Sequence, residues 1–276
     1  MRLTKLAWNG CLLCCLSLLL LLLTGCNMLP SITIGVDAQT PTSAVNTWNT
    51  VAPGVEVRSE IWKSPTTATI SDTVSIVRFN LHTVKLSVAY QPDQPLSMQQ
   101  WMQKEQATAL INGGYFDGLD HATALVVSNG LAFGTSYQGF GGMLDVTSQG
   151  HIQLRSLREQ PYDPSEGLAQ ATQCTPMFLV DGKRTQFNSD SKTSPRSVVA
   201  LDKQGRLLFI VSPGLAFTLD DMATLLAKSD LSLVTALNLD GGSSTGLYVN
   251  DSHDSSQNIT LDSYVNLPLV IVVKEK

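Results

Sequence analysis

The chain has 276 residues, of which 43% are hydrophobic, and a net charge of −5. This acidic balance argues against a nucleic-acid partner, because such a surface needs a basic patch. Four of the five cysteines lie in the first 26 residues, so that Cys174 alone follows them, and this excludes an internal disulfide or a cysteine-based zinc site there.

The first 25 residues have the layout of a secretory signal. Arg2 and Lys5 precede an apolar run from Leu12 to Leu23, with no acidic residue. The run ends at Leu23-Thr24-Gly25-Cys26, which resembles the lipobox of bacterial lipoproteins. We therefore predict a signal peptide over 1–25 and a lipid on Cys26 that holds the chain to a membrane of the cell envelope, outside the cytoplasm. A transmembrane anchor is the alternative, but the run is short and no basic stop-transfer cluster follows it.

Residues 26–47 are expected to form a flexible tether. They are rich in Ser, Thr, Pro and Asn and show little apolar periodicity. Removal of residues 1–25 takes away two basic and no acidic residues, so the net charge falls from −5 to −7. The remaining chain shows neither a repeat nor a second linker, and we predict one domain over residues 48–276.

The domain has the pattern of short strands interrupted by two helices. Ser97 is expected to cap a helix from Met98 to about Thr108, and Thr218 a second helix whose first-turn acids, Asp220 and Asp221, suit the helix dipole. The expected strands are 75–79, 85–90, 109–111, 125–127, 150–154, 177–180, 197–201, 206–211, 235–239 and 267–273. This composition of elements predicts an α+β domain, built around a mostly antiparallel or mixed sheet with about two flanking helices.

Two loops, 112–117 and 238–245, combine paired glycines with polar side chains directly after buried strands. Glycine can take a positive φ and bring successive amides to one anion, so these loops are candidates for a phosphate or sugar cradle. The alternative is a pair of tight turns in which Asp and Asn satisfy the local backbone. The residues expected to contact the ligand are Gly113, Gly114, Gly241, Gly242, Ser244 and Thr245.

Several segments carry a family resemblance: Ile111 to Phe116, Leu125 to Gly130, Pro195 to Ala200, Gly214 to Leu226, Leu237 to Thr245, and Val265-Asn266. In these the chain resembles the phosphodiester glycosidases, relatives of the enzyme that uncovers mannose 6-phosphate, from about Val51 to Val273. The Asp-Gly-Gly-x-Ser-Ser/Thr element at 240–245 is the most specific match. Many family members have a third glycine or a proline at the position of Ser243, and the small size of Ser243 keeps the turn short. Arg155 to Thr172 matches no family landmark, and we expect substrate selectivity there.

The resemblance implies hydrolysis of a sugar 1-phosphodiester at the bond between the anomeric carbon and the phosphate oxygen. The phosphodiester is already a good leaving group, so stabilising the departing phosphate and an oxocarbenium-like sugar matters more than a general acid. The expected partner is a sugar-phosphate-containing glycan or a small phosphodiester. No organic cofactor is expected, and a divalent cation near Asp240 is an open possibility.

The same resemblance suggests a role for four side chains. Asp240 would be the catalytic carboxylate, as base or nucleophile, and Arg196 would hold the phosphate through its planar guanidinium. Asn112 would bond sugar hydroxyls or orient water, and Asp117 is a second carboxylate candidate. The alternatives are a surface ion pair for Arg196 and a turn residue for Asp117.

Two other functions remain open at this level. The chain could be a non-catalytic glycan-binding or phosphoglycan-binding lipoprotein of the same fold. It could also be an ordinary glycosidase or a phosphodiesterase that breaks a different bond. The sequence leaves the sugar, its anomeric configuration and the stereochemical course undetermined.

Overall fold

A computed structural model describes residues 46–251, 254–255 and 258–276 of the protein. The predicted signal peptide, Cys26 and nearly all of the predicted tether lie outside these residues. Within the described ranges, no helix is long and apolar enough to cross a bilayer.

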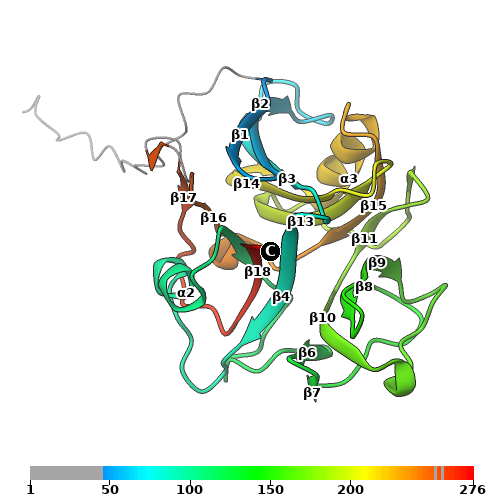
Figure 1. Ribbon diagram of the computed structural model, residues 1–276. Coiled ribbons are helices and arrows are strands. Elements are labelled where there is room, and N and C mark those ends of the chain that lie inside the picture. Colours follow the sequence, from blue (N-terminus) through cyan, green and yellow to red (C-terminus); the bar gives the residue numbers. More distant parts are fainter. Residues whose placement is uncertain (1–45, 252–253, 256–257) are drawn as a thin grey trace, which may run out of the picture. The chain divides into compact units, whose positions relative to one another are not determined.

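The described chain forms three sheets whose strands pair antiparallel (Figure 1). The first sheet has the order β1 (Asn49–Ala52), β2 (Val55–Lys63), β3 (Ser71–Phe79), β14 (Leu207–Phe217), β13 (Ser194–Asp202), β15 (Leu233–Asn238), β11 (Met177–Val180) and β12 (Lys183–Arg184). The second has the order β7 (Leu131–Phe133), β6 (Val126–Ser128), β10 (Leu168–Cys174), β8 (Gly142–Thr147) and β9 (Ile152–Ser156). The third has the order β17 (Ile259–Leu261), β16 (Leu247–Val249), β5 (Ala109–Asn112), β18 (Leu269–Glu275) and β4 (Val84–Tyr90).

Two α-helices, α2 (Met98–Glu105) and α3 (Leu219–Lys228), and two 3-10 turns, η1 (Pro164–Glu166) and η2 (Gly242–Ser244), accompany the sheets. The α+β class, the mainly antiparallel sheet and the two flanking helices are therefore confirmed. The strands that the sequence analysis did not place individually are β1, β2, β7, β8, β10, β12, β16 and β17. Each of these except β2, β8 and β10 has only two to four residues, too few for a periodic pattern to stand out.

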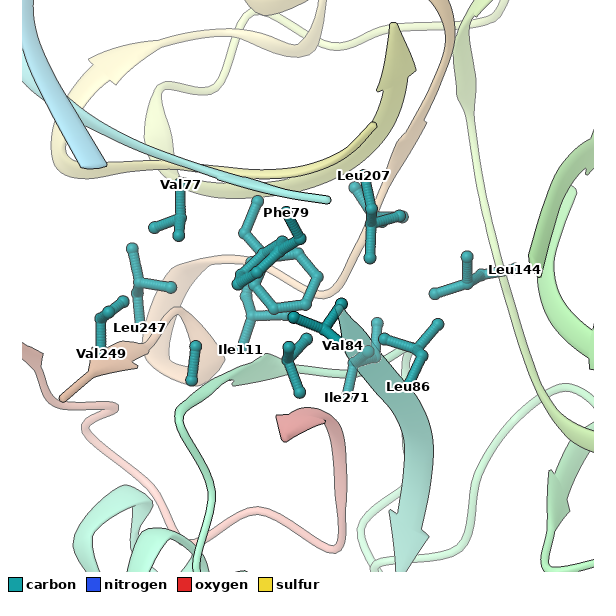
Figure 2. Close-up of a cluster of buried hydrophobic side chains, with 14 of the residues drawn as sticks. Val77, Phe79, Val84, Leu86, Ile111, Leu144, Leu207, Leu247, Val249 and Ile271 are labelled. Carbon is teal, nitrogen blue, oxygen red and sulfur yellow. The ribbon is translucent and has the colours of Figure 1, made fainter. Parts of the chain in front are cut away.

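The main core lies where the three sheets meet (Figure 2). Phe79 of β3, Ile111 of β5 and Leu144 of β8 point into one apolar cluster, and all three are fully buried. Phe79 packs edge-on against Phe209 of β14, with ring centroids 4.8 Å apart. Phe79 and Phe209 belong to the first sheet, Leu144 to the second and Ile111 to the third, so this shared cluster packs the three sheets against one another.

Both predicted helix caps are confirmed. Ser97 accepts from the backbone N–H of Gln100 and the Gln100 side chain bonds back, which is a capping box. The helix ends at Glu105 instead of near Thr108, because Gln106 takes a left-handed conformation with φ +49°. The buried helix residues Met98, Trp101 and Met102 pack against the third sheet.

Helix α3 lies against the first sheet on the side opposite the main core (Figure 1). Thr218 caps it, and Asp221 completes a capping box by accepting from the Thr218 N–H at 3.2 Å. Asp221 also accepts a hydrogen bond from Thr66, which explains why this carboxylate is buried. The acids of the first turn therefore support the helix start, as predicted.

Candidate functional site

The two glycine loops predicted from the sequence meet at one place. The first leaves β5 of the third sheet and the second leaves β15 of the first sheet. The backbone N–H of Asp240 donates to the carbonyl of Gly113 at 3.1 Å, which joins the loops directly. Segments far apart in the chain thus form a single site at the junction of two sheets.

Asn112 ties this junction together. Its side-chain amide donates to the carbonyl of Asp240 at 2.7 Å and to that of Gly113 at 3.3 Å. Its side-chain oxygen accepts from the Ser197 hydroxyl at 2.7 Å and from the Gly246 N–H at 3.2 Å. With two donors and two acceptor positions occupied and only 1% of the residue exposed, the side chain has no capacity left for a sugar. The predicted sugar contact of Asn112 is therefore replaced by a positioning role.

The second glycine loop makes a tight turn, but only one of its glycines needs a positive φ. Gly242 has φ +61°, whereas Gly241 has an ordinary φ of −129°. Gly241 is required for a different reason, since a Cβ there would lie 2.8 Å from the carbonyl oxygen of Pro195. The expectation that both glycines take positive φ is thus wrong for Gly241. In the first loop Gly113 and Gly114 are buried, and a Cβ on either would collide with neighbouring atoms at 2.4 Å.

Of the hydroxyls expected to contact the ligand, those of Ser244 and Thr245 are buried and do not line an open surface. Ser244 is 4% exposed, and its side chain hydrogen-bonds Asp240. Thr245 is also buried, and its hydroxyl has no hydrogen-bond partner in the described structure. Ser244 therefore bonds Asp240, and its burial argues against the direct ligand contact expected from the sequence.

Asp240 is a partly buried carboxylate at the end of β15. Burial raises the pKa of Asp240 above its ordinary value, while hydrogen bonds from the Ser244 side chain and, at 2.8 Å, from the Gly241 N–H act in the opposite direction. These two donors hold the carboxylate in one orientation. A carboxylate that is desolvated yet oriented is suited to act as a base or a nucleophile.

Arg196 lies near the start of β13, and the register of β13 with β15 brings it to the level of Asp240. In the antiparallel pairing Val198 lies opposite Asn238, and the bond from the Leu239 N–H to the Ser197 carbonyl continues the same register. Arg196 is only 8% exposed, and its guanidinium donates to the carbonyls of Phe217 at 3.1 Å and Lys192 at 2.8 Å.

The guanidinium of Arg196 forms no ion pair with a carboxylate of any described residue. The alternative of a surface ion pair is therefore wrong. Desolvation by burial lowers the pKa of Arg196, while the charge of the Asp190 carboxylate acts in the opposite direction. Such a cation, with its position fixed by backbone carbonyls, is a suitable binding group for an anion.

Tyr115 is a site residue that the sequence analysis did not select. Its hydroxyl donates to the Thr175 carbonyl at 2.9 Å and accepts from the Asn238 amide at 2.8 Å. Burial raises the pKa of Tyr115 far above its ordinary value, the negative charge of Asp240 adds to this shift, and Arg196 opposes it. Tyr115 is the aromatic residue of the first loop's Asn-Gly-Gly-aromatic-Phe motif, and that position was the available signal.

Asp117 lies away from this group. It is exposed, and its carboxylate accepts from the N–H groups of Leu119 and His121, both at 2.9 Å. These backbone hydrogen bonds lower the pKa of Asp117. The carboxylate thus closes its own loop, and the structure favours the turn reading over the predicted catalytic one.

Two adjoining hollows border the site. The Tyr115 cavity, of about 750 Å³, is lined by Tyr115, Phe140 and Arg158 among others. The Arg196 hollow, of about 620 Å³, is lined by Arg196, Lys192 and Ser194 among others. Asn188 and Leu219 line both, so the two hollows adjoin each other.

The remaining thiol and the possible cation add little to this chemistry. Cys174 is fully buried in the main core, and burial raises its pKa, so the protonated thiol serves as a packing residue. Among residues 46–251, 254–255 and 258–276 there is no group of three or more His, Cys, Asp or Glu side chains that could hold a metal ion. The cation considered near Asp240 gains no support from the site.

Comparison with known structures reveals the same fold in other proteins. The catalytic domain of zebrafish N-acetylglucosamine-1-phosphodiester alpha-N-acetylglucosaminidase, auto-inhibited by its pro-peptide, has a TM-score of 0.65 and 18% identity, over 85% of this chain and 87% of its own. A Synechocystis protein has a TM-score of 0.60 and 14% identity, over 81% of this chain and 62% of its own. A Burkholderia pseudomallei protein has a TM-score of 0.54 and 9% identity, over 76% and 75%. At these identities the likeness shows the fold alone.

A comparison with curated protein sequences gave no match. The family model for phosphodiester glycosidases does match, over residues 105–273, which is more than half of the chain. The matched range includes both glycine loops, Tyr115, Arg196 and Asp240. The chain belongs to the phosphodiester glycosidase family.

Proposed function

We propose that the protein hydrolyses a sugar 1-phosphodiester at the bond between the anomeric carbon and the phosphate oxygen. The observation that carries this proposal is the proximity of a buried guanidinium without a direct ion pair, Arg196, to an oriented carboxylate, Asp240, at the ends of neighbouring strands. Arg196 can bind an anionic phosphate, and Asp240 can act on the carbon atom next to that phosphate. The activity named for the zebrafish relative, on an N-acetylglucosamine 1-phosphodiester, agrees with this division of roles.

In the proposed reaction Arg196 binds the phosphate and stabilises the charge that develops as the bond to the sugar breaks. Asp240 either removes a proton from the attacking water or attacks the anomeric carbon itself. The oxygen of water ends on the sugar, and the phosphate leaves with its other ester bond intact. Tyr115 forms the wall beside both groups, and Asn112 holds the carboxylate loop in place.

The proposed place of action is the cell envelope. The signal layout and the Leu-Thr-Gly-Cys run before residue 27 support a lipid on Cys26, and the tether would let the domain work at the membrane surface. We expect the protein with native Cys26 to sediment with membranes and a Cys26→Ser variant to be recovered mainly in soluble or unprocessed form. Labelling with a radioactive fatty acid should mark only the native protein. Equal labelling of both would contradict the assignment.

The bond that is broken can be identified by isotope incorporation. When a panel of sugar 1-phosphodiesters, including that of N-acetylglucosamine, is hydrolysed in oxygen-18 water, we expect the label in the sugar hydroxyl, because water attacks carbon. Mass spectrometry of both products measures this. Label in the phosphate would instead indicate a phosphodiesterase, and binding without release of sugar would favour the non-catalytic alternative. A parallel assay with chelator tests the divalent cation.

The two carboxylates suggested by the sequence give opposite expectations. Asp240→Asn should lower kcat by about 100-fold to 10,000-fold, since it removes the base or nucleophile. Asp117→Asn should stay within about twofold of the native rate, because that side chain is exposed and bonds only its own loop. Steady-state kinetics on the substrate found above compares them. A native rate for Asp240→Asn, or a large loss for Asp117→Asn, would reverse the assignment.

The pH profile reports on the environment of Asp240. Because burial raises its pKa and only the ionised form is active, kcat/KM should fall on the acid side with an apparent pKa above the ordinary aspartate value. Ser244→Ala removes a hydrogen bond that favours the ionised form, so this limb should move to higher pH. The neighbouring Ser243→Ala changes an exposed hydroxyl and should leave the limb in place. Identical profiles for all three proteins would exclude Asp240 as the titrating group.

A further inference from the structure

The Tyr115 cavity is larger than the reaction itself requires. Its volume of about 750 Å³ falls in the range of sites for drug-sized ligands, about 300–1,000 Å³. A single sugar ring is smaller than such ligands. The cavity therefore has room beyond the one sugar that carries the phosphate.

Phe140 gives this cavity an exposed aromatic wall. Phe140 is 46% exposed although it lines the cavity, and its ring stacks on Tyr137 with centroids 4.6 Å apart and planes at 29°. Gly139 and Gly141 flank it with φ of +72° and +74°, so a glycine-bracketed bend presents the ring. An aromatic ring supported from behind and open towards a cavity offers an apolar face to the C–H groups of a sugar ring.

The charged side chains that line the cavity are Arg158 and Glu159. Both are exposed, and neither forms an ion pair within the described part of the chain. Arg158 donates to the Gly139 carbonyl at 3.4 Å, next to the bend that carries Phe140. One cation and one anion favour a neutral ligand with hydroxyl donors and acceptors over a second phosphate. Both belong to segment 155–172, where we expected selectivity from the sequence.

The position of Arg196 determines which part of a substrate would enter the cavity. Arg196 lines the adjoining hollow, while Tyr115 lines the cavity, and Asn188 and Leu219 lie between the two. If the phosphate binds Arg196, the rest of its ester lies in the Arg196 hollow. The sugar then lies on the Tyr115 side, together with any further sugar attached to it.

We propose that the Tyr115 cavity binds a second, uncharged sugar residue stacked on Phe140, so that the preferred substrates are oligosaccharide 1-phosphodiesters and not monosaccharide ones. This assignment rests on the proposed function for the order of phosphate and sugar. It deepens that function, because it specifies the length of the sugar part.

Matched pairs of para-nitrophenyl phosphodiesters test the proposal: N-acetylglucosamine with its disaccharide chitobiose, and glucose with its disaccharide maltose. The native protein should show the higher kcat/KM for the disaccharide of at least one pair. Phe140→Ala should lower the ratio of disaccharide to monosaccharide kcat/KM about five- to tenfold. Phe133→Ala is the control, because Phe133 is similarly exposed, at 40%, and likewise packs on a tyrosine, Tyr90, but outside the cavity. It should keep the native ratio.

Binding measurements test the cavity assignment independently of the proposed hydrolysis. Calorimetry with the same probes is carried out in the Asp240→Asn background, with and without Phe140→Ala. Tighter binding of a disaccharide probe that depends on Phe140 supports the proposal. If a disaccharide probe binds in this way but the native protein cleaves no probe, the proposed hydrolysis is contradicted while the cavity assignment stands. Absence of binding, equal affinity for both members of each pair, or an equal loss for both on Phe140→Ala would overturn the assignment.

Discussion

The geometry of the site depends on the buried amide of Asn112. Its four hydrogen bonds reach Asp240 and Gly113 on one side and Ser197 and Gly246 on the other. Each partner left unpaired in the interior would cost about 1–3 kcal/mol, so the arrangement in which all are satisfied is strongly preferred. The amide thereby sets where the loop after β15 runs relative to the loop after β5. The apolar cluster that Phe79 and Phe209 share with Ile111 packs the two parent sheets against each other, and Asn112 aligns their ends.

The placement of the site between sheets has a chemical advantage. Arg196 and Asp240 both leave the first sheet, but Asn112, Gly113 and Tyr115, which support them, come from the loop of the third. Groups supported from two sides are less free to adjust to bulk solvent. Desolvation acts on both charges, towards neutrality in each case. A preorganised cation and carboxylate in such surroundings can stabilise a charge-separated transition state with little rearrangement.

Local chemistry made part of this structure predictable. The caps at Ser97 and Thr218 depend on residues within one turn, and both were found. The family motifs likewise placed Asp240, Arg196 and the glycine loops in one region. Sequence could not show how hydrogen bonds are shared in three dimensions. Asn112 and Ser244 carry the polar groups expected of ligand contacts, yet partners distant in the chain, or the neighbouring Asp240 itself, already engage them.

Other differences have the same origin. Gly241 is needed because the carbonyl of Pro195 approaches it, and no local pattern indicates that contact. Asp117 satisfies neighbouring amides, a use that is indistinguishable from catalysis in a linear sequence. Tyr115 lies in the first-loop motif, in which only the asparagine and the two glycines were assigned roles from the sequence. Strands β8 and β10 pair with each other across the segment that lacks family landmarks, so neither periodicity nor resemblance pointed to them.

Under the proposed function, the buried charge of Arg196 links occupancy of the site to stability of the fold. Keeping a cation away from water without a direct ion pair costs free energy, and an anion that binds there would recover part of it. Any ligand that binds only the folded state also shifts the unfolding equilibrium by mass action. The protein is thus least stable when its site is vacant. Abundance of a suitable phosphoglycan would then influence how long the folded domain persists as well as how often it turns over.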